Sequence, residues 1–312
     1  MLQYLIILLD DTSTSFCHYS PIFSPKGEES RRLMPLETLR KGIRFGMMEN
    51  LMIQFVYPGY ELPAEYVEVI ESIDHSKIKP IVEGADVVVL NRLSNVEADV
   101  PVVLRISKRE LFADGDKIAA LLEKTPRLNI VLTDVETFTE EDFERYKALL
   151  EKLSIKLEQM YVNGKTPQLN FLTDRMMLKE MNNCGAGDTT ITLAPNGMFY
   201  VCPAFYYENE ADSIGDLEHG LNIKNKQLYK LEYAPICRHC DAYQCKRCIW
   251  LNRRTTSEVN TPSHEQCVLA HLERNASRDL LNNIRKHGTF LPEQEDIKEI
   301  YYLDPFDKRE EW

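Results

Sequence analysis

The placement of cysteines constrains this chain more than any other feature of its sequence. Of its eight cysteines, Cys17 stands alone near the start, and the other seven fall within the stretch 184–267. They include two Cys-x-x-Cys pairs, and two thiolates at that spacing can chelate one metal through a tight turn. The seven are Cys184, Cys202, Cys237, Cys240, Cys245, Cys248 and Cys267. The spacing predicts a metal-binding C-terminal part after a cysteine-poor N-terminal part.

Composition limits where the chain works and what it binds. It has 312 residues, with 49 acidic and 37 basic side chains, and its net charge of −12 argues against nucleic-acid binding. The apolar run at 4–9 is too short to span a bilayer and has no basic segment before it. We therefore expect a soluble, cytoplasmic protein without a membrane partner. Thiols stay reduced in that compartment, so structural disulfides are not expected.

Strand-like and helix-like patterns alternate along the N-terminal part. Strands are expected at 2–9, 52–56, 87–90, 102–106 and 128–132, and helices at 36–47, 66–73, 111–122 and 139–153. This alternation predicts an α/β fold, with a parallel sheet whose strands are joined by helical crossovers. Periodicity alone does not say whether the sheet is open or curled into a barrel.

Two kinds of metal centre suit the seven thiols. Adjacent Cys-x-x-Cys pairs make a four-thiolate zinc site in many small domains, although the loop between these two pairs is short for a zinc ribbon. Seven thiols also nearly supply two four-ligand sites, and iron–sulfur clusters take four cysteinates each. His239 lies inside one pair, where it could replace a ligand or point outward. Arg238, Lys246 and Arg247 are expected to offset thiolate and cluster charge, or to steer a partner.

The full spacing resembles the seven-cysteine signature of SPASM domains. It reads Cys-x12-Gly-x4-Cys, a gap, Cys-x2-Cys-x4-Cys-x2-Cys, a gap, and Cys, and residues 213–217 resemble the family's short glycine-centred strand. The family usually has five and three residues where this chain has four and two. The resemblance implies two auxiliary 4Fe–4S clusters. It assigns Cys184, Cys202 and Cys248 to the first cluster, which lacks a fourth thiolate, and Cys237, Cys240, Cys245 and Cys267 to the second.

The N-terminal part resembles a radical SAM barrel that lacks its own cluster motif. Radical SAM enzymes carry CxxxCxxC after the first strand, and the matching positions here are Asp10, Thr14 and Cys17. Hydroxyl and carboxylate groups are poor ligands for iron–sulfur clusters. After the second strand, Gly59, Tyr60 and Glu61 resemble a degenerate GGEP motif, with tyrosine at the second glycine. We therefore do not expect this chain to cleave S-adenosylmethionine on its own.

The opening LQYLIILLDDTSTSFCHYSP resembles the start of the CXXX repeat peptide maturase family. Those proteins belong to bacterial systems that modify ribosomally made peptides with Cys-x-x-x repeats, and they have the SPASM signature without the radical SAM triad. The resemblance implies a degenerate radical SAM-like partial (β/α) barrel at 1–175 and a SPASM-like iron–sulfur domain at 176–290. An acidic tail, which we expect to pack loosely, would occupy 291–312.

Three functions are compatible with these features. The chain could be a cluster-bearing partner that recognises a cysteine-rich precursor peptide, or relays electrons, for a companion radical SAM enzyme. It could instead be a peptide-modifying enzyme whose incompletely ligated cluster binds a substrate thiolate. The third possibility is a zinc-binding scaffold without redox activity.

Several residues have two interpretations. Asp10 and Asp11 end a strand where ligands bind in α/β folds, so they could bind a metal or cap the next element. Cys17 beside His18 could be a remnant site or a partly buried thiol near the barrel mouth, and a catalytic pair is not expected between sequence neighbours. The segment 297–302 could be an edge strand or a partner contact.

Overall fold

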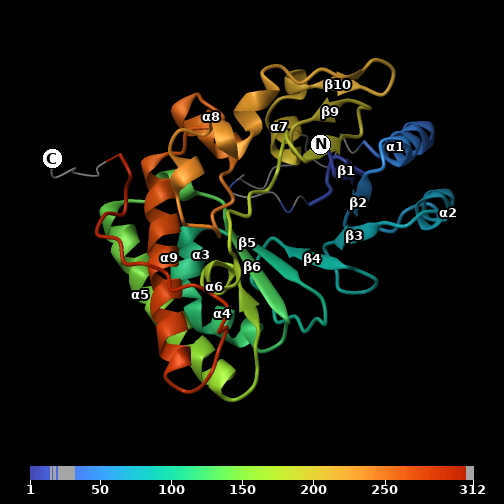
Figure 1. Ribbon diagram of the computed structural model, residues 1–312. Coiled ribbons are helices and arrows are strands. Elements are labelled where there is room, and N and C mark those ends of the chain that lie inside the picture. Colours follow the sequence, from blue (N-terminus) through green and yellow to red (C-terminus); the bar gives the residue numbers. More distant parts are fainter. Residues whose placement is uncertain (15, 17–18, 20–31, 307–312) are drawn as a thin grey trace.

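The computed structural model describes residues 1–14, 16, 19 and 32–306, and within them a nine-stranded, mostly parallel sheet forms the centre of the fold (Figure 1). Its order is β7-β6-β5-β4-β3-β2-β1-β8-β9, and β9 runs antiparallel to β8. The strands are β1 (Tyr4–Leu8), β2 (Met52–Val56), β3 (Ser76–Lys79), β4 (Val87–Leu90), β5 (Val102–Ile106), β6 (Arg127–Leu132), β7 (Gln168–Leu169), β8 (Thr190–Leu193) and β9 (Phe199–Tyr200).

Strand β1 lies inside the sheet and is covered on both faces. Side chains alternate along a strand, so Leu5 and Ile7 face helix α1 (Leu36–Met48), whereas Tyr4 and Ile6 line a cavity on the other face. Glycines let α1 approach closely: a Cβ at Gly46 would stand 2.8 Å from Ile53 Cδ1. The apolar run that predicted this strand therefore reflects burial on both sides.

Helical crossovers connect most of the parallel strands, as the sequence predicted. Capping boxes begin two of these helices, at Ser107 with Glu110 and at Thr139 with Asp142. The alternation is broken where loops lead from β3 to β4 and from β4 to β5. The crossover helices are α1, α2 (Ala64–Glu71), α3 (Lys108–Ala113), α4 (Gly115–Leu122) and α5 (Glu140–Val162).

The C-terminal part continues the same sheet. Strand β8 pairs in parallel with β1, with Tyr4 opposite Thr190, and a turn at Gly197 returns the chain into β9. The predicted division at 175–176 stays a prediction, and β8 crosses it by joining the N-terminal strands. The remaining elements are α6 (Asp174–Met177), α7 (Pro203–Glu208), β10 (Gly215–Asp216), β11 (Gly220–Leu221), α8 (Ile249–Thr256) and α9 (His264–Arg285).

Helix α9 packs along α5 and carries the chain back across the barrel (Figure 1). The segment after it was expected to pack loosely, but residues 291–306 are anchored. Ile297 is 5% exposed and Asp304 is 6% exposed, and the Asp304 carboxylate lies 2.5 Å from His264 Nδ1. Residues 297–302 form no strand, so the predicted edge strand is wrong. None of the helices in the described part is long and apolar enough to cross a membrane.

The interface between α5 and α9 buries one carboxyl group. Glu273 accepts a hydrogen bond from Tyr146 Oη at 2.7 Å and from Gln244 Nε2 at 3.3 Å, and it is 7% exposed. Burial raises the pKa of Glu273 to about 7, although these two hydrogen bonds act in the opposite direction.

We expect Glu273→Gln to flatten part of the pH dependence of stability. Between its ordinary pKa and about 7, the folded state binds more protons than the unfolded state at this residue, so its contribution to stability falls as the pH rises. The variant should match the wild type at pH 4.5 and exceed it at pH 8 by up to about 3 kcal/mol. Urea unfolding measures both values. Glu151→Gln, on the exposed face of α5, is the control and should change neither.

Candidate functional site: two cysteine groups beside a closed barrel position

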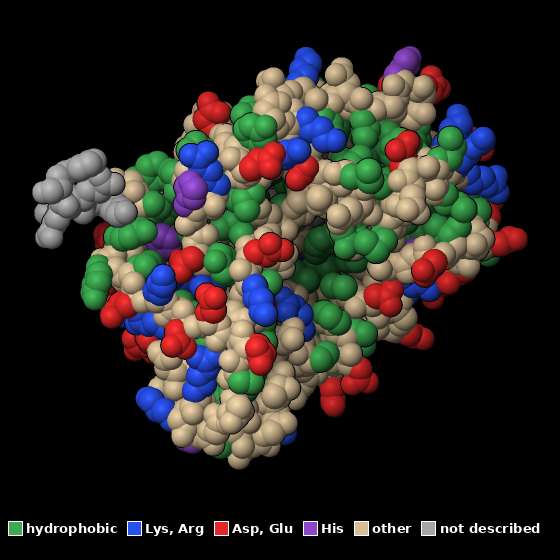
Figure 2. All heavy atoms as spheres, viewed as in Figure 1, with side chains coloured by type: hydrophobic (Ala, Val, Ile, Leu, Met, Phe, Trp, Pro, Cys, Tyr) green, Lys and Arg blue, Asp and Glu red, His purple; other side chains and the backbone are tan. Residues whose placement is uncertain are grey.

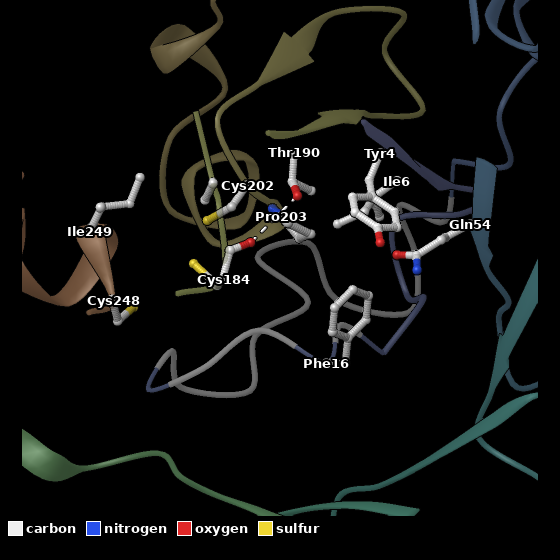
Figure 3. Close-up of a pocket in the computed structure, with 11 residues that line it drawn as sticks. Tyr4, Ile6, Phe16, Gln54, Cys184, Thr190, Cys202, Pro203, Cys248 and Ile249 are labelled. Atoms are coloured by element: carbon white, nitrogen blue, oxygen red, sulfur yellow. Dashed lines mark hydrogen bonds between the residues drawn. The ribbon is translucent and has the colours of Figure 1, made fainter. Parts of the chain in front are cut away.

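Three of the seven cysteines line one cavity. Cys184, Cys202 and Cys248 come from separate segments, and their side chains border a hollow of about 280 Å³ (Figure 3). Cys184 lies in the loop before β8, Cys202 directly precedes α7, and Cys248 directly precedes α8. The structure thus brings together the three residues that the sequence assigned to a first cluster.

Strands of the sheet form the opposite wall of this cavity. Tyr4 and Ile6 come from β1 and Gln54 from β2, and Figure 3 shows them across the cavity from the cysteines. Pro203 and Ile249 contribute further apolar surface. The cavity is therefore mainly apolar, with three thiols on one side and the Gln54 amide on the other. Cavities of this kind suit a small apolar group or a side chain.

The turn before β8 gives Cys184 its position. Gly185 and Gly187 have φ angles of +69° and +78°, which side chains rarely adopt. At Gly187 a Cβ would also stand 2.6 Å from the Tyr229 ring. The backbone N–H of Cys184 donates to the carbonyl of Lys246 at 3.4 Å, which ties this loop to the segment that carries the Cys-x-x-Cys pairs.

The other four cysteines form a second, more buried group. Cys237 and Cys267 are buried, and the charges of Cys237, Cys240, Cys245 and Cys267 all act on one another. Burial raises the pKa of Cys237 to about 11, and burial reinforced by neighbouring thiols raises the pKa of Cys245 and of Cys267 well above the ordinary value. These four are the residues that the sequence assigned to a second cluster.

Hydrogen bonds hold individual sulfurs of this group. The backbone N–H of Ala242 donates to Cys240 Sγ at 3.4 Å, and His271 Nε2 lies 3.5 Å from the same sulfur. His271 Nδ1 in turn lies 2.5 Å from the carbonyl oxygen of Leu303, so the C-terminal segment fixes the ring. His239, the histidine inside the first pair, is exposed instead, which favours the interpretation that it points outward.

The donor chemistry suits an iron–sulfur or zinc group. Among the described residues, none of these seven cysteines forms a disulfide. In the part of the chain that is described, no three His, Cys, Asp or Glu side chains stand close enough together to hold a single ion. In a 4Fe–4S cluster each thiolate binds a different iron, so the ligands stand farther apart than around one ion. The group of four thiols fits such a cluster by donor type and number, and the group of three fits by donor type with one ligand missing.

Side chains from the two segments that resemble altered radical SAM motifs are hydrogen-bonded to each other. Asp10, at the first slot of the lost motif, is fully buried and accepts a hydrogen bond from Tyr60 Oη at 2.7 Å. The backbone and side chain of Thr12 donate to the other oxygen of Asp10. Tyr60 is the residue that replaces the second glycine of the GGEP-like segment. The two altered motifs therefore contact each other.

The remaining positions of these motifs lie around that contact. Thr14 Oγ1 accepts a hydrogen bond from Asn91 Nδ2 at 3.2 Å, Glu61 is exposed, and a Cβ at Gly59 would meet nothing within 4 Å. Cys17 and His18 lie outside the described residues, so both interpretations of Cys17 stay open.

Asp11 is held from the C-terminal part. Tyr206 Oη donates to its carboxylate, and Arg32 Nε lies 3.6 Å away. Tyr207 Oη donates to the carbonyl of Ser13 at 2.7 Å. Hydroxyl and guanidinium donors thus surround the strand end at Asp10 and Asp11, which favours capping over metal binding. No sequence pattern marks Tyr206 or Tyr207, and the single available signal is their position just after Cys202-Pro203.

Comparison with solved structures finds this fold in anSMEcpe. A histidine-tagged form with bound AdoMet has a TM-score of 0.62 and 12% identity, over 91% of this chain and 96% of that chain. Native anSMEcpe with bound AdoMet and the Cp18Cys peptide has a TM-score of 0.61 and 13% identity, over 91% and 99%. Identities this low show the fold alone. The structural matches confirm the expected α/β architecture, a radical SAM-like partial barrel with a further C-terminal part. No protein-family model and no curated protein matches this chain.

We expect Tyr60→Phe to destabilise the protein by about 1–2 kcal/mol, because it removes a hydrogen bond to a buried carboxylate. Urea unfolding at pH 7 gives the difference. Tyr233→Phe is the matched control, since Tyr233 is 51% exposed, and it should change stability by less than about 0.5 kcal/mol. Equal stability of the two variants would show that the contact does not hold the strand end.

Proposed function

We propose that this chain is a cluster-bearing component of a system that modifies cysteine-rich peptides, and that it does not cleave S-adenosylmethionine itself. One observation carries the proposal: the buried Asp10 accepts a hydrogen bond from Tyr60, so the two altered motifs fill the barrel position together. Two groups of cysteines without disulfides lie in the same molecule. A chain built in this way suits recognition or electron relay better than radical generation.

In this proposal the cysteines hold two 4Fe–4S clusters. Cys184, Cys202 and Cys248 would bind the first, and their shared cavity supports the assignment. The second would be bound by the four thiols whose charges act on one another, Cys237, Cys240, Cys245 and Cys267. Such clusters supply one-electron transfer when bound. The protein's own contribution is to shield the second group from water and to leave the first beside an apolar cavity.

The partner would be a peptide with Cys-x-x-x repeats, presented to a companion radical SAM enzyme. The structural relative anSMEcpe has been solved with a bound peptide, Cp18Cys, which makes a peptide partner reasonable for this fold. In this chain the cavity beside Cys184, Cys202 and Cys248 has the size and apolar lining to take one side chain. A repeat peptide would place a thiol and its neighbours there in turn.

Metal and acid-labile sulfide content, measured after anaerobic reconstitution, tests the cofactor. We expect about eight irons and eight sulfides per chain. About twelve irons would mean that a third cluster forms in the barrel and would overturn the proposed loss of radical chemistry. One or two zinc ions without sulfide would instead leave the scaffold alternative.

Cys240→Ala should reduce the iron content from about eight to about four per chain, because it removes a ligand of the second group. It should also lower the stability of the loaded protein, since metal binding and folding are coupled. Cys17→Ala is the control and should leave iron unchanged. Iron loss in Cys17→Ala would show that the N-terminal position still binds a cluster.

Filling the cavity tests peptide recognition. Gln54→Trp should weaken binding of a Cys-x-x-x repeat peptide at least about tenfold, which is about 1.4 kcal/mol, by occupying space opposite the thiols. Fluorescence anisotropy of a labelled peptide measures the dissociation constant. Gln159→Trp, on the exposed face of α5, should bind like the wild type. Unchanged binding in Gln54→Trp would place the peptide elsewhere.

The same cavity favours a second candidate, a stand-alone peptide-modifying enzyme. The first group offers three thiols, one fewer than a 4Fe–4S cluster uses, and it borders the cavity directly. A substrate thiolate could supply the fourth ligand. Modification of the repeat peptide by the purified chain, with a chemical reductant and no second protein, would favour this candidate. Modification only after a radical SAM enzyme is added would favour the first.

A further inference from the structure

Three basic residues lie next to the cysteine pairs, and they differ in exposure and in pairing. Arg238 is exposed. Lys246 is paired, with its Nζ 3.9 Å from the Asp174 carboxylate and 3.4 Å from the carbonyl of Asn182. Arg247 is only 4% exposed, although it carries a full charge. It stands between Cys245 of the second group and Cys248 of the first.

The guanidinium of Arg247 is largely without partners. Its Nη2 donates to the carbonyl of Tyr229, whereas its buried Nε and Nη1 have no hydrogen-bond partner. Within the described residues, no carboxylate lies at ion-pair distance from it. Buried arginines are normally paired with an anion, because an isolated charge in a protein interior is strongly disfavoured. Two donor nitrogens and one positive charge are therefore available to a negatively charged group.

The backbone of Arg247 is in an unfavourable conformation. Arg247 has a φ of +47°, in the left-handed region that residues with side chains seldom adopt. Its N–H donates to Cys245 Sγ at 3.5 Å, so the turn also serves the second thiol group. The guanidinium acts on the same group, because its charge lowers the pKa of Cys237 against the effect of burial. Strain of this kind clusters at ligand sites.

We propose that Arg247 is the cation that binds the metal–sulfur group held by Cys237, Cys240, Cys245 and Cys267, with Nε and Nη1 donating to its sulfur atoms. This inference rests on the proposed function, which supplies the group. Four thiolates around either a 4Fe–4S core or a zinc ion leave a net negative charge, which the buried guanidinium offsets. A substrate carboxylate is a poorer candidate, because Arg247 is buried and does not line the cavity beside Cys184.

The proposal requires that residue 247 supply both a positive charge and several hydrogen-bond donors. Lysine keeps the charge but offers a single ammonium in place of a planar set of donors. Methionine fills similar space and removes both charge and donors. Hydrogen bonds to cluster sulfurs raise the reduction potential, since they stabilise the more negative, reduced form. Losing them should therefore make one cluster harder to reduce.

Anaerobic reconstitution of the full chain tests the proposal. We expect Arg247→Met to bind about four irons instead of about eight, and Arg247→Lys to bind about eight, with one of two cluster midpoints shifted to more negative potential. Arg238→Met removes the same charge from an exposed site beside Cys237 and should match the wild type in both respects. Electron paramagnetic resonance during a redox titration follows the midpoints, and circular dichroism shows whether each variant folds.

The outcomes separate this inference from the proposed function. Wild-type levels of iron and both midpoints unchanged in Arg247→Lys and Arg247→Met would overturn the role of Arg247 and leave the clusters in place. A wild type that binds zinc without sulfide would overturn the iron–sulfur proposal, and zinc content of Arg247→Met would then test the arginine. A wild type that binds no metal would overturn both. If Arg247→Met fails to fold, an unshifted midpoint in Arg247→Lys still overturns the proposal.

Discussion

The pairing of β8 with β1 determines where everything else in this protein lies. Strand β1 is flanked by β2 on one side and β8 on the other, both parallel to it. The loop that carries Cys184 leads directly into β8, and the hairpin through β9 leads directly to Cys202. Thiols from the C-terminal part are thereby fixed against the strands that open the chain. The cavity between Tyr4, Ile6 and these thiols follows from that single pairing.

The closed barrel position depends on contacts that reach across the molecule. Asp10 and Asp11 are both nearly inaccessible, and buried carboxylates require donors. Tyr60 from the end of β2 supplies one, and Tyr206 from α7 supplies another. The C-terminal part therefore supplies hydrogen-bond donors to carboxylates at the end of β1, the strand end that binds a cluster in radical SAM enzymes.

On the face seen in Figure 2, acidic and basic side chains are interspersed around a hollow with hydrophobic side chains at its base.

Local patterns in the sequence predicted most of the helices and strands. Contacts between residues far apart in the sequence could not be predicted in this way. The buried run of β1 and the apolar stripes of α1 and α5 come from neighbouring residues. Strand β3 was missed because it has four residues and only Ile78 among them is buried. The resemblance to SPASM domains implied the group of three cysteines that share a cavity. No local pattern could reveal that Tyr60 contacts Asp10 or that Arg247 is buried without a carboxylate.

The barrel position at Asp10 and Asp11 differs from the second cysteine group in how its charged groups are paired. At the barrel position both oxygens of the Asp10 carboxylate accept hydrogen bonds. The neighbouring Asp11 accepts one from Tyr206, while its Oδ2 lies 3.6 Å from Arg32 Nε without a hydrogen-bond partner. At the second cysteine group, burial raises the pKa of the thiols, and two nitrogens of the buried Arg247 guanidinium have no hydrogen-bond partner. Under the proposed function, a cationic metal core would replace the four thiol protons, and the resulting anionic group would pair with Arg247. The charges of the C-terminal cysteine group thus support the proposal that the cofactor binds there.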